Sequence, residues 1–312
     1  MRSIACLMPL RQAPRLPTGT LLCALAMTIL GSSFAVSRLL LGYPTLTGQA
    51  LRYAGAAVLL ALLAARSPRV RPVRRGDLVR LGALAFTGLA GFNVCVLAAL
   101  RHADPALLGT VLGGTPLLLA VLPAVLGGRR PSARLAASGA VVAAGVALVQ
   151  GGGHATLAGL LWALGALAGE VCFTLLAAPM LPVLGPVRVS AWACALAVPQ
   201  LVVAAAVTGE YRHLRTPTPT ESAALLYLTV VLTVGAFGCW YGGVRRLGVE
   251  RAGVFAGLIP VASLAGAALL DRSVPDPVQL AGTAAVALAL VAALRPAHEP
   301  EARRSASRTA SA

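Results

Sequence analysis

The chain has 312 residues, of which 58% are apolar and only 12% are charged. Soluble globular proteins are about 45–50% apolar and about 25% charged, so a soluble enzyme and a disordered chain both fit poorly. The charged residues are mostly basic, 26 against 10 acidic, and every basic residue is Arg. A nucleic-acid binder is also disfavoured, because polar surface and aromatic rings for base stacking are scarce. The composition therefore indicates a membrane protein with no nucleic-acid partner.

The apolar residues form ten runs of roughly 18–23 residues, the length that a helix needs to cross about 30 Å of hydrocarbon. The runs cover 19–38, 46–65, 79–100, 105–126, 134–150, 157–178, 189–208, 223–244, 252–270 and 277–294. Lipid offers the backbone no hydrogen-bond partners, so spanning segments of this kind must be helical. We therefore predict an all-α integral membrane protein with ten transmembrane helices, followed by a disordered cytoplasmic tail at 295–312. A cleaved signal peptide is a weaker interpretation of the first run, because its apolar character continues through Leu39–Leu41.

The Arg residues predict the orientation of the chain in the membrane. If the connectors alternate between the two sides, 20 of the 26 Arg lie on the side that holds both termini and five lie on the other. Arg-rich connectors stay in the cytoplasm. We therefore expect a multi-pass protein of the cell (inner) membrane with both termini cytoplasmic.

The sequence repeats itself at a distance of 144 residues, where 81–116 aligns with 225–260 without a gap. A Gly-x-x-x-Gly-x-x-Pro pattern recurs in this alignment, first as Gly109, Gly113 and Pro116 and then as Gly253, Gly257 and Pro260. Small residues let helices approach closely, and proline can bend a helix, so these six residues are candidates for tight packing or for a flexing gate. Each half, 1–150 and 157–294, contains five predicted spans. An odd number reverses the second copy, which predicts two inverted repeats, an arrangement typical of secondary transporters.

Several segments resemble the EamA-type branch of the drug/metabolite transporter superfamily. They are LGSSF (30–34), QALRYAGAAVLLALL (49–63), LAALRHADPALLGTVLGGTPLLL (97–119) and WYGGVRRLGVERAGVFAGLIPVASL (240–264). The resemblance implies that spans one to four and six to nine enclose a central cavity, with five and ten at the periphery. One departure is Arg129, which stands near a position where the family often has Glu. A gating role for that acid therefore does not transfer to this chain.

Two ionisable residues lie deep within predicted spans. Glu170 is about 20 Å from the outer end of its span, and Arg52 is about 10 Å from the same side. Such groups are costly in hydrocarbon and face a cavity or a partner. Glu170 is a candidate for carrying a proton or contacting a cation, the alternative being a structural hydrogen bond. For Arg52 the alternatives are an anion contact and a snorkelling residue at the interface.

Polar or small residues recur at helical spacing in four spans and predict one amphiphilic cavity. These stripes are Trp162–Ala166–Glu170–Thr174–Ala178, Thr28–Ser32–Ala35, Phe86–Ala90–Asn93 and Thr229–Thr233–Phe237 with Trp240 and Tyr241. Ser32, Asn93, Trp240 and Tyr241 are thus further cavity candidates. For Asn93, Trp240 and Tyr241, packing between helices is the stronger interpretation.

These patterns favour a secondary transporter, an exporter or exchanger of a small metabolite or drug-like solute, with proton coupling through Glu170. The sequence has no Walker-type phosphate loop and no His spacing typical of metal ligands, so we expect no cofactor, no metal and no enzymatic activity. The alternatives are a polytopic membrane enzyme and a passive channel or scaffold. Beyond the solute and the lipid bilayer, the small-residue faces of 134–150 and 277–294 would allow a homodimer.

Overall fold

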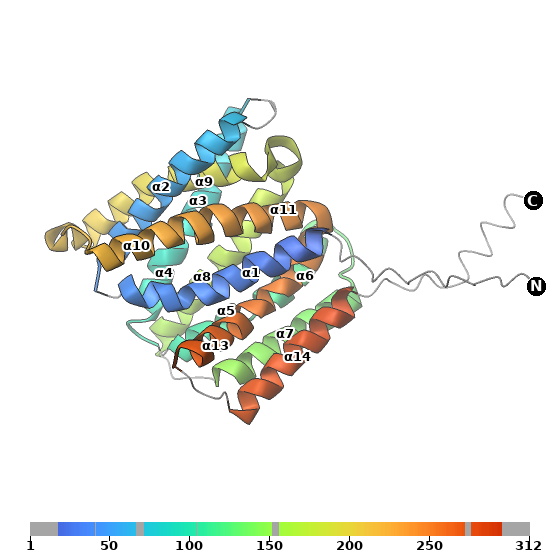
Figure 1. Ribbon diagram of the computed structural model, residues 1–312. Helices are drawn as coiled ribbons and strands as arrows, with labels where there is room; N and C mark the ends of the chain where they lie inside the picture. Colours follow the sequence, from blue (N-terminus) through green and yellow to red (C-terminus); the bar gives the residue numbers. More distant parts are fainter. Residues whose placement is uncertain are drawn as a thin grey trace, which may run out of the picture.

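The computed structural model describes residues 18–40, 42–66, 72–103, 105–151, 156–271 and 276–294 (Figure 1). These residues form helices and turns, and no β-strand occurs among them. In the first half the α-helices are α1 (Thr18–Ser37), α2 (Thr45–Arg66), α3 (Arg75–Ala85), α4 (Phe92–Ala99), α5 (Pro105–Leu112), α6 (Thr115–Leu126) and α7 (Ala133–Gln150). In the second half they are α8 (Leu157–Ala177), α9 (Leu181–Val207), α10 (Pro219–Tyr227), α11 (Phe237–Leu247), α12 (Val249–Gly253), α13 (Leu258–Asp271) and α14 (Pro277–Leu294). The predicted tail at 295–312 lies outside the described residues.

Five helical stretches of the described chain are long and apolar enough to cross a membrane. They are Thr45–Arg66, Arg75–Ala99, Leu107–Leu126, Leu157–Val207 and Pro219–Leu247. Leu157–Val207 contains two predicted spans, because the chain turns at Gly185, whose φ of +77° favours glycine. Three apolar stretches are shorter, Thr18–Ser33, Ala133–Val149 and Pro277–Ala293. The all-α membrane class is confirmed, whereas the count of ten transmembrane helices stays a prediction.

From the third predicted span of each half onward, the two halves share positions at which their helices begin and break. A π-helical segment, Phe86–Gly91, joins α3 to α4, and another, Leu228–Ala236, joins α10 to α11 at the 144-residue offset. The break between α5 and α6 at 113–114 likewise corresponds to the 3₁₀ turn Val254–Gly257 that precedes α13. The bounds of α7 and α14 differ by 144 residues at both ends. The repeat in the sequence is therefore also a repeat in backbone conformation.

Helices from opposite halves pack against one another. In the first half, α1 lies between α11 and α13, and in the second half α8 packs against α4 and α5 (Figure 1). α2 packs along α9, and α7 along α14. This mutual packing places the core of the protein between the two halves.

Glycine faces join α7 to α14 at the edge of the bundle. A Cβ on Gly145 would lie 2.8 Å from the carbonyl oxygen of Gly282, so only glycine permits this approach. The small-residue faces of α7 and α14 thus pack against each other within one chain. They do not support a homodimer, which stays a prediction.

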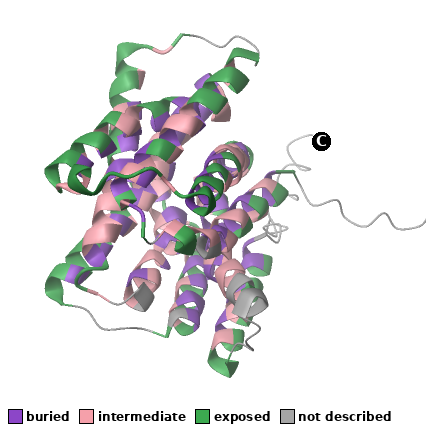
Figure 2. Cartoon of the chain, turned by 60° about the vertical axis from the view of Figure 1, so that its left-hand side comes forward, coloured by how far each residue is buried: buried purple, intermediate pink, exposed green. Residues whose placement is uncertain are grey.

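The outer surface of the bundle carries large apolar side chains. Exposed residues lie at the helix ends and along the outward faces (Figure 2), and they include Val79, Val207 and Leu288, each more than 70% exposed. Water would disfavour such a surface, whereas lipid tails suit it.

Candidate functional site

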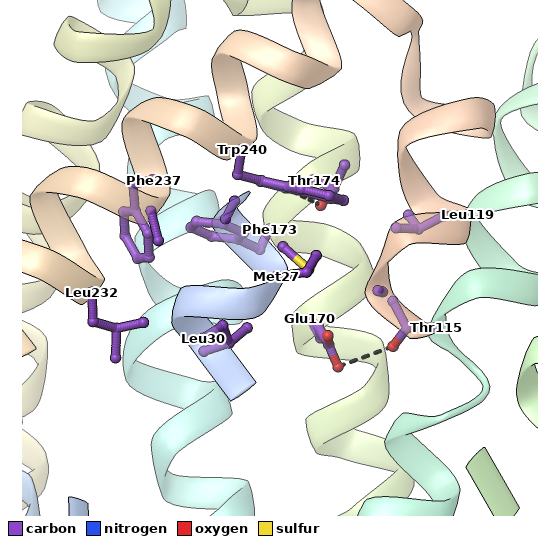
Figure 3. Close-up of a pocket in the computed structure, with 13 residues that line it drawn as sticks. Met27, Leu30, Thr115, Leu119, Glu170, Phe173, Thr174, Leu232, Phe237 and Trp240 are labelled. Atoms are coloured by element: carbon purple, nitrogen blue, oxygen red, sulfur yellow. Dashed lines mark hydrogen bonds between the residues drawn. The ribbon is translucent and has the colours of Figure 1, made fainter. Parts of the chain in front are cut away.

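A small cavity lies between the halves, near the middle of the bundle (Figure 3). Its volume is about 90 Å³, below the range of roughly 300–1,000 Å³ that is usual for ligand sites. Five of the predicted spans contribute to its walls. The lining residues are Ala26, Met27, Leu30, Thr115, Leu119, Glu170, Phe173, Thr174, Leu232, Ala236, Phe237, Trp240 and Ala256.

Glu170 is the ionisable residue among those lining the cavity. Its Oε2 accepts a hydrogen bond of 2.9 Å from the Thr115 hydroxyl (Figure 3). Thr115 begins α6 and is buried, whereas Glu170 lies on α8, so this bond joins the first half of the chain to the second. A carboxyl group in a largely apolar cavity has few groups to stabilise its charge. Such a group suits proton exchange or contact with a cation.

Aromatic rings form the opposite wall of the cavity and are held by hydrogen bonds. The Trp240 indole donates to the Thr174 hydroxyl at 3.2 Å (Figure 3). The Phe173 ring centroid is 4.9 Å from that of Phe237 and 5.0 Å from that of Tyr241. Tyr241 does not line the cavity but supports it, because its hydroxyl donates to the carbonyl of Phe173 at 3.2 Å. The wall is therefore rigid and apolar.

Three other candidate residues form hydrogen bonds to near neighbours in the sequence. The Ser32 hydroxyl donates to the carbonyl of Ile29, and the Asn93 amide donates to the carbonyl of Leu89. Arg52 donates to the Tyr53 hydroxyl at 2.6 Å and lies over its ring. Of the candidate residues, Glu170 and Trp240 line the cavity. Ser32, Asn93 and Arg52 are not among its lining residues, and their roles in substrate binding stay predictions.

The expected cavity face of the first span was wrong. α1 presents Ala26, Met27 and Leu30 to the cavity, whereas Thr28 is exposed. Sequence reasoning also missed Thr115, the partner of Glu170. Thr115 stands directly before Pro116, in the Gly/Pro segment for which tight packing and a flexing gate were the two interpretations.

The candidate gate glycines allow close helix contacts beside the cavity. A Cβ on Gly113 would lie 2.5 Å from Val146 Cγ1, and added Cβ atoms on Gly253 and Gly257 would collide with Leu119 and Val142. Gly109 accepts a backbone hydrogen bond from Gly113. Pro116 and Pro260 are buried near the starts of α6 and α13. Close packing at three of these glycines is thus observed, and a gating motion stays a prediction.

The two ends of the bundle are held by different polar contacts. At one end Arg129 and Glu250, from opposite halves, form an ion pair of 2.8 Å. At the other end the Glu210 carboxylate accepts hydrogen bonds from the backbone N–H groups of Leu46 and Thr47. Each of these contacts joins a residue of the first half to a residue of the second.

A second ion pair, between Arg215 and Glu221, lies at the same end as Glu210. Arg215 also donates to the carbonyl of Gly42, and its guanidinium lies 5.3 Å from the centre of the Tyr43 ring. The hydrogen bond to Glu221 raises the pKa of Arg215 further above its usual range, with burial acting in the opposite direction. Arg215 therefore stays charged and links the connector before α10 to the connector before α2.

The apolar outer surface and the apolar helices define a multi-pass membrane protein. The model of the EamA-like transporter family matches the chain twice, at residues 17–150 and 157–295. The chain belongs to this family of membrane transporters.

Known proteins agree with this assignment. The chain is 25% identical to the uncharacterized transporter YetK of Bacillus subtilis (strain 168) over 250 residues, which cover 77% of this chain and 76% of YetK. It is 37% identical to the uncharacterized transporter YdeK of the same strain over 89 residues, 28% of this chain and 31% of YdeK. A crystal structure described only as that of a protein superimposes with a TM-score of 0.73 at 19% identity, over 89% of this chain and 96% of that one. This last likeness concerns the fold alone.

Proposed function

We propose that the protein is a secondary transporter that exports or exchanges a small solute by alternating access, coupled to protons through Glu170. The observation that carries this proposal is the Glu170 carboxyl group, which lies in the cavity between the halves and bonds to Thr115 across them. A carboxyl group at such a place can release a proton when a solute binds and take one up when it leaves.

The small volume of the cavity supports alternating access. A space of about 90 Å³ is too small for most metabolites, so a solute would require the bundle to open. The matching helix breaks in the two halves offer two related places to open, one toward each side of the membrane. We also propose, from the distribution of Arg, that both termini face the cytoplasm of a cell membrane.

The lining favours a small amphiphilic solute, because one carboxyl group and two threonines face aromatic and aliphatic walls. A passive channel is the rival function. Counterflow of a labelled solute distinguishes them, because saturable exchange requires a site that faces one side at a time.

Proton coupling is tested with the full chain in lipid vesicles that contain a pH-sensitive dye. Small amines, amino acids and nucleosides are added singly, and a solute that the protein exchanges for protons changes the internal pH. Glu170→Gln keeps the shape of the side chain and should abolish this signal. Asp77→Asn removes a carboxylate that caps the start of α3 and should retain it. An unchanged pH signal in Glu170→Gln would contradict the role of Glu170 in proton coupling, and the absence of any signal from the unchanged chain would contradict coupling to protons.

A further inference from the structure

A second hollow lies on the outside of the bundle, between the C-terminal half of α2 and the N-terminal half of α9. Its volume is about 390 Å³, more than four times that of the central cavity. Six alanines line it, together with Arg188 and the half-exposed Trp192. The alanines leave an apolar trench open to the surroundings of the bundle.

The trench has a polar end and an apolar end. Arg188 donates to the carbonyl of Ala64 at 3.3 Å, so its guanidinium lies beside the last turn of α2. From there the trench extends to Ala195 on α9 and Ala57 on α2, both seven residues away. Seven residues of helix measure about 10 Å, most of the roughly 15 Å of hydrocarbon in one leaflet.

Positive charge gathers at the polar end. Arg66, Arg74 and Arg75 lie at the same end of the bundle and are exposed. A guanidinium has five N–H donors in a planar fork, which matches the oxygens of a phosphate. Trp192 follows Arg188 by one helical turn, and Trp is typical of the level of lipid headgroups.

We propose that this trench binds one anionic phospholipid, with its phosphate on Arg188 and one acyl chain along the alanines of α2 and α9. The trench has a cation at one end and, from there on, apolar walls that run parallel to the helices. A phospholipid in one leaflet has the matching arrangement, with its phosphate at one end and its acyl chains along the membrane normal. The predicted orientation makes this the cytoplasmic leaflet, where anionic lipids attract Arg-rich segments. The site is separate from the proposed transport cavity and does not depend on it.

Trp192 provides the probe for this site. The full chain with Trp162→Phe and Trp240→Phe is reconstituted in phosphatidylcholine nanodiscs, so that Trp192 is its remaining tryptophan. Increasing fractions of phosphatidylglycerol or phosphatidylcholine with brominated acyl chains are added, since bromine quenches nearby indole fluorescence. We expect brominated phosphatidylglycerol to quench half of the Trp192 fluorescence at a lipid fraction about fivefold lower than brominated phosphatidylcholine requires.

Two pairs of variants decide the outcome. Arg188→Gln should abolish the preference for the anionic lipid, whereas Arg75→Gln, an exposed charge at the same end, should retain it. Ala61→Phe fills the trench and should abolish the preference, whereas Val58→Phe, on the exposed surface of α2 outside the trench, should retain it.

Four results would overturn the proposal. They are equal quenching by both lipids, a preference that survives either Arg188→Gln or Ala61→Phe, an equal loss in Arg75→Gln, and a Trp192 that neither lipid quenches. An equal loss in Arg75→Gln would indicate that diffuse surface charge attracts the lipid. A Trp192 that neither lipid quenches would indicate that protein covers the trench.

Discussion

The two halves of the chain are alike in backbone and unlike in chemistry. α1 and α8 both line the cavity, α1 with Ala26, Met27 and Leu30, and α8 with Glu170, Phe173 and Thr174. α1 thus presents apolar side chains where α8 presents a carboxyl group and a hydroxyl, and the first half contributes one hydroxyl, that of Thr115 on α6. In the proposed mechanism, related scaffolds would let either half move, whereas one ionisable group in the cavity would be sufficient to carry one proton. We therefore expect substitutions of scaffold residues to have similar effects in both halves. Substitutions of the polar residues in the cavity should have an effect that the corresponding substitutions in the other half do not have.

The largest effects on stability are expected where the scaffold is tightest. Gly113→Ala and Gly257→Ala, at corresponding positions, each bring a methyl group into a valine of a neighbouring helix. Overpacking of this kind typically costs about 1–3 kcal/mol, so both variants should unfold at clearly lower SDS fractions. Gly82→Ala is the control, since an added Cβ there meets nothing within 4 Å. If only one of the two variants lost stability, the result would contradict a shared packing role of Gly113 and Gly257.

The bond between Thr115 and Glu170 tests the polar site. Thr115→Val keeps the shape of the side chain but removes the donor to Glu170. Hydrogen bonds to charged groups are worth about 1.5–3 kcal/mol, so we expect transport at least about tenfold slower in the vesicle assay. The corresponding residue of the second half is Ile259, and Ile259→Val should retain the rate. Equal losses in both variants would indicate a packing effect instead.

The sequence predicted the scaffold better than the faces of its helices. Apolar runs and the 144-residue repeat indicate helices and their breaks, because length and composition decide what can span lipid. Polar stripes were less informative, since Ser32 and Asn93 bond to carbonyls of their own helices and need no cavity. Glu170, a carboxyl group without such a local partner, is among the residues that line the cavity, and its role in transport stays a prediction. Its distant partner Thr115 follows only from the packing of α6 against α8.

The π-helical segments explain a further part of the difference. An extra residue in a turn shifts the side chains that follow it to another face. Phe86–Gly91 precedes Asn93, and Leu228–Ala236 precedes Trp240. Asn93, which follows the first segment, is not among the residues that line the cavity, whereas Phe237 and Trp240, which follow the second, are. Regular helical spacing alone therefore does not decide which face continues across such a segment.

The smallest effects are expected at the two ends of the bundle, where the halves are also unlike. The carboxylate side chain of Glu221 is only 8% exposed, whereas that of Glu250 is 22% exposed and its partner Arg129 is 65% exposed. Exposed pairs contribute about 0–1 kcal/mol and are screened by salt. Arg215→Gln should therefore lower the Tm more than Arg129→Gln, because it leaves a buried carboxylate without its cation and removes the bond to Gly42. Thermal unfolding in detergent at low and high salt measures both changes, and the Arg129→Gln difference should shrink at high salt. A larger loss for Arg129→Gln would show that the ion pair joining the halves, rather than the contacts of Arg215, holds the bundle closed.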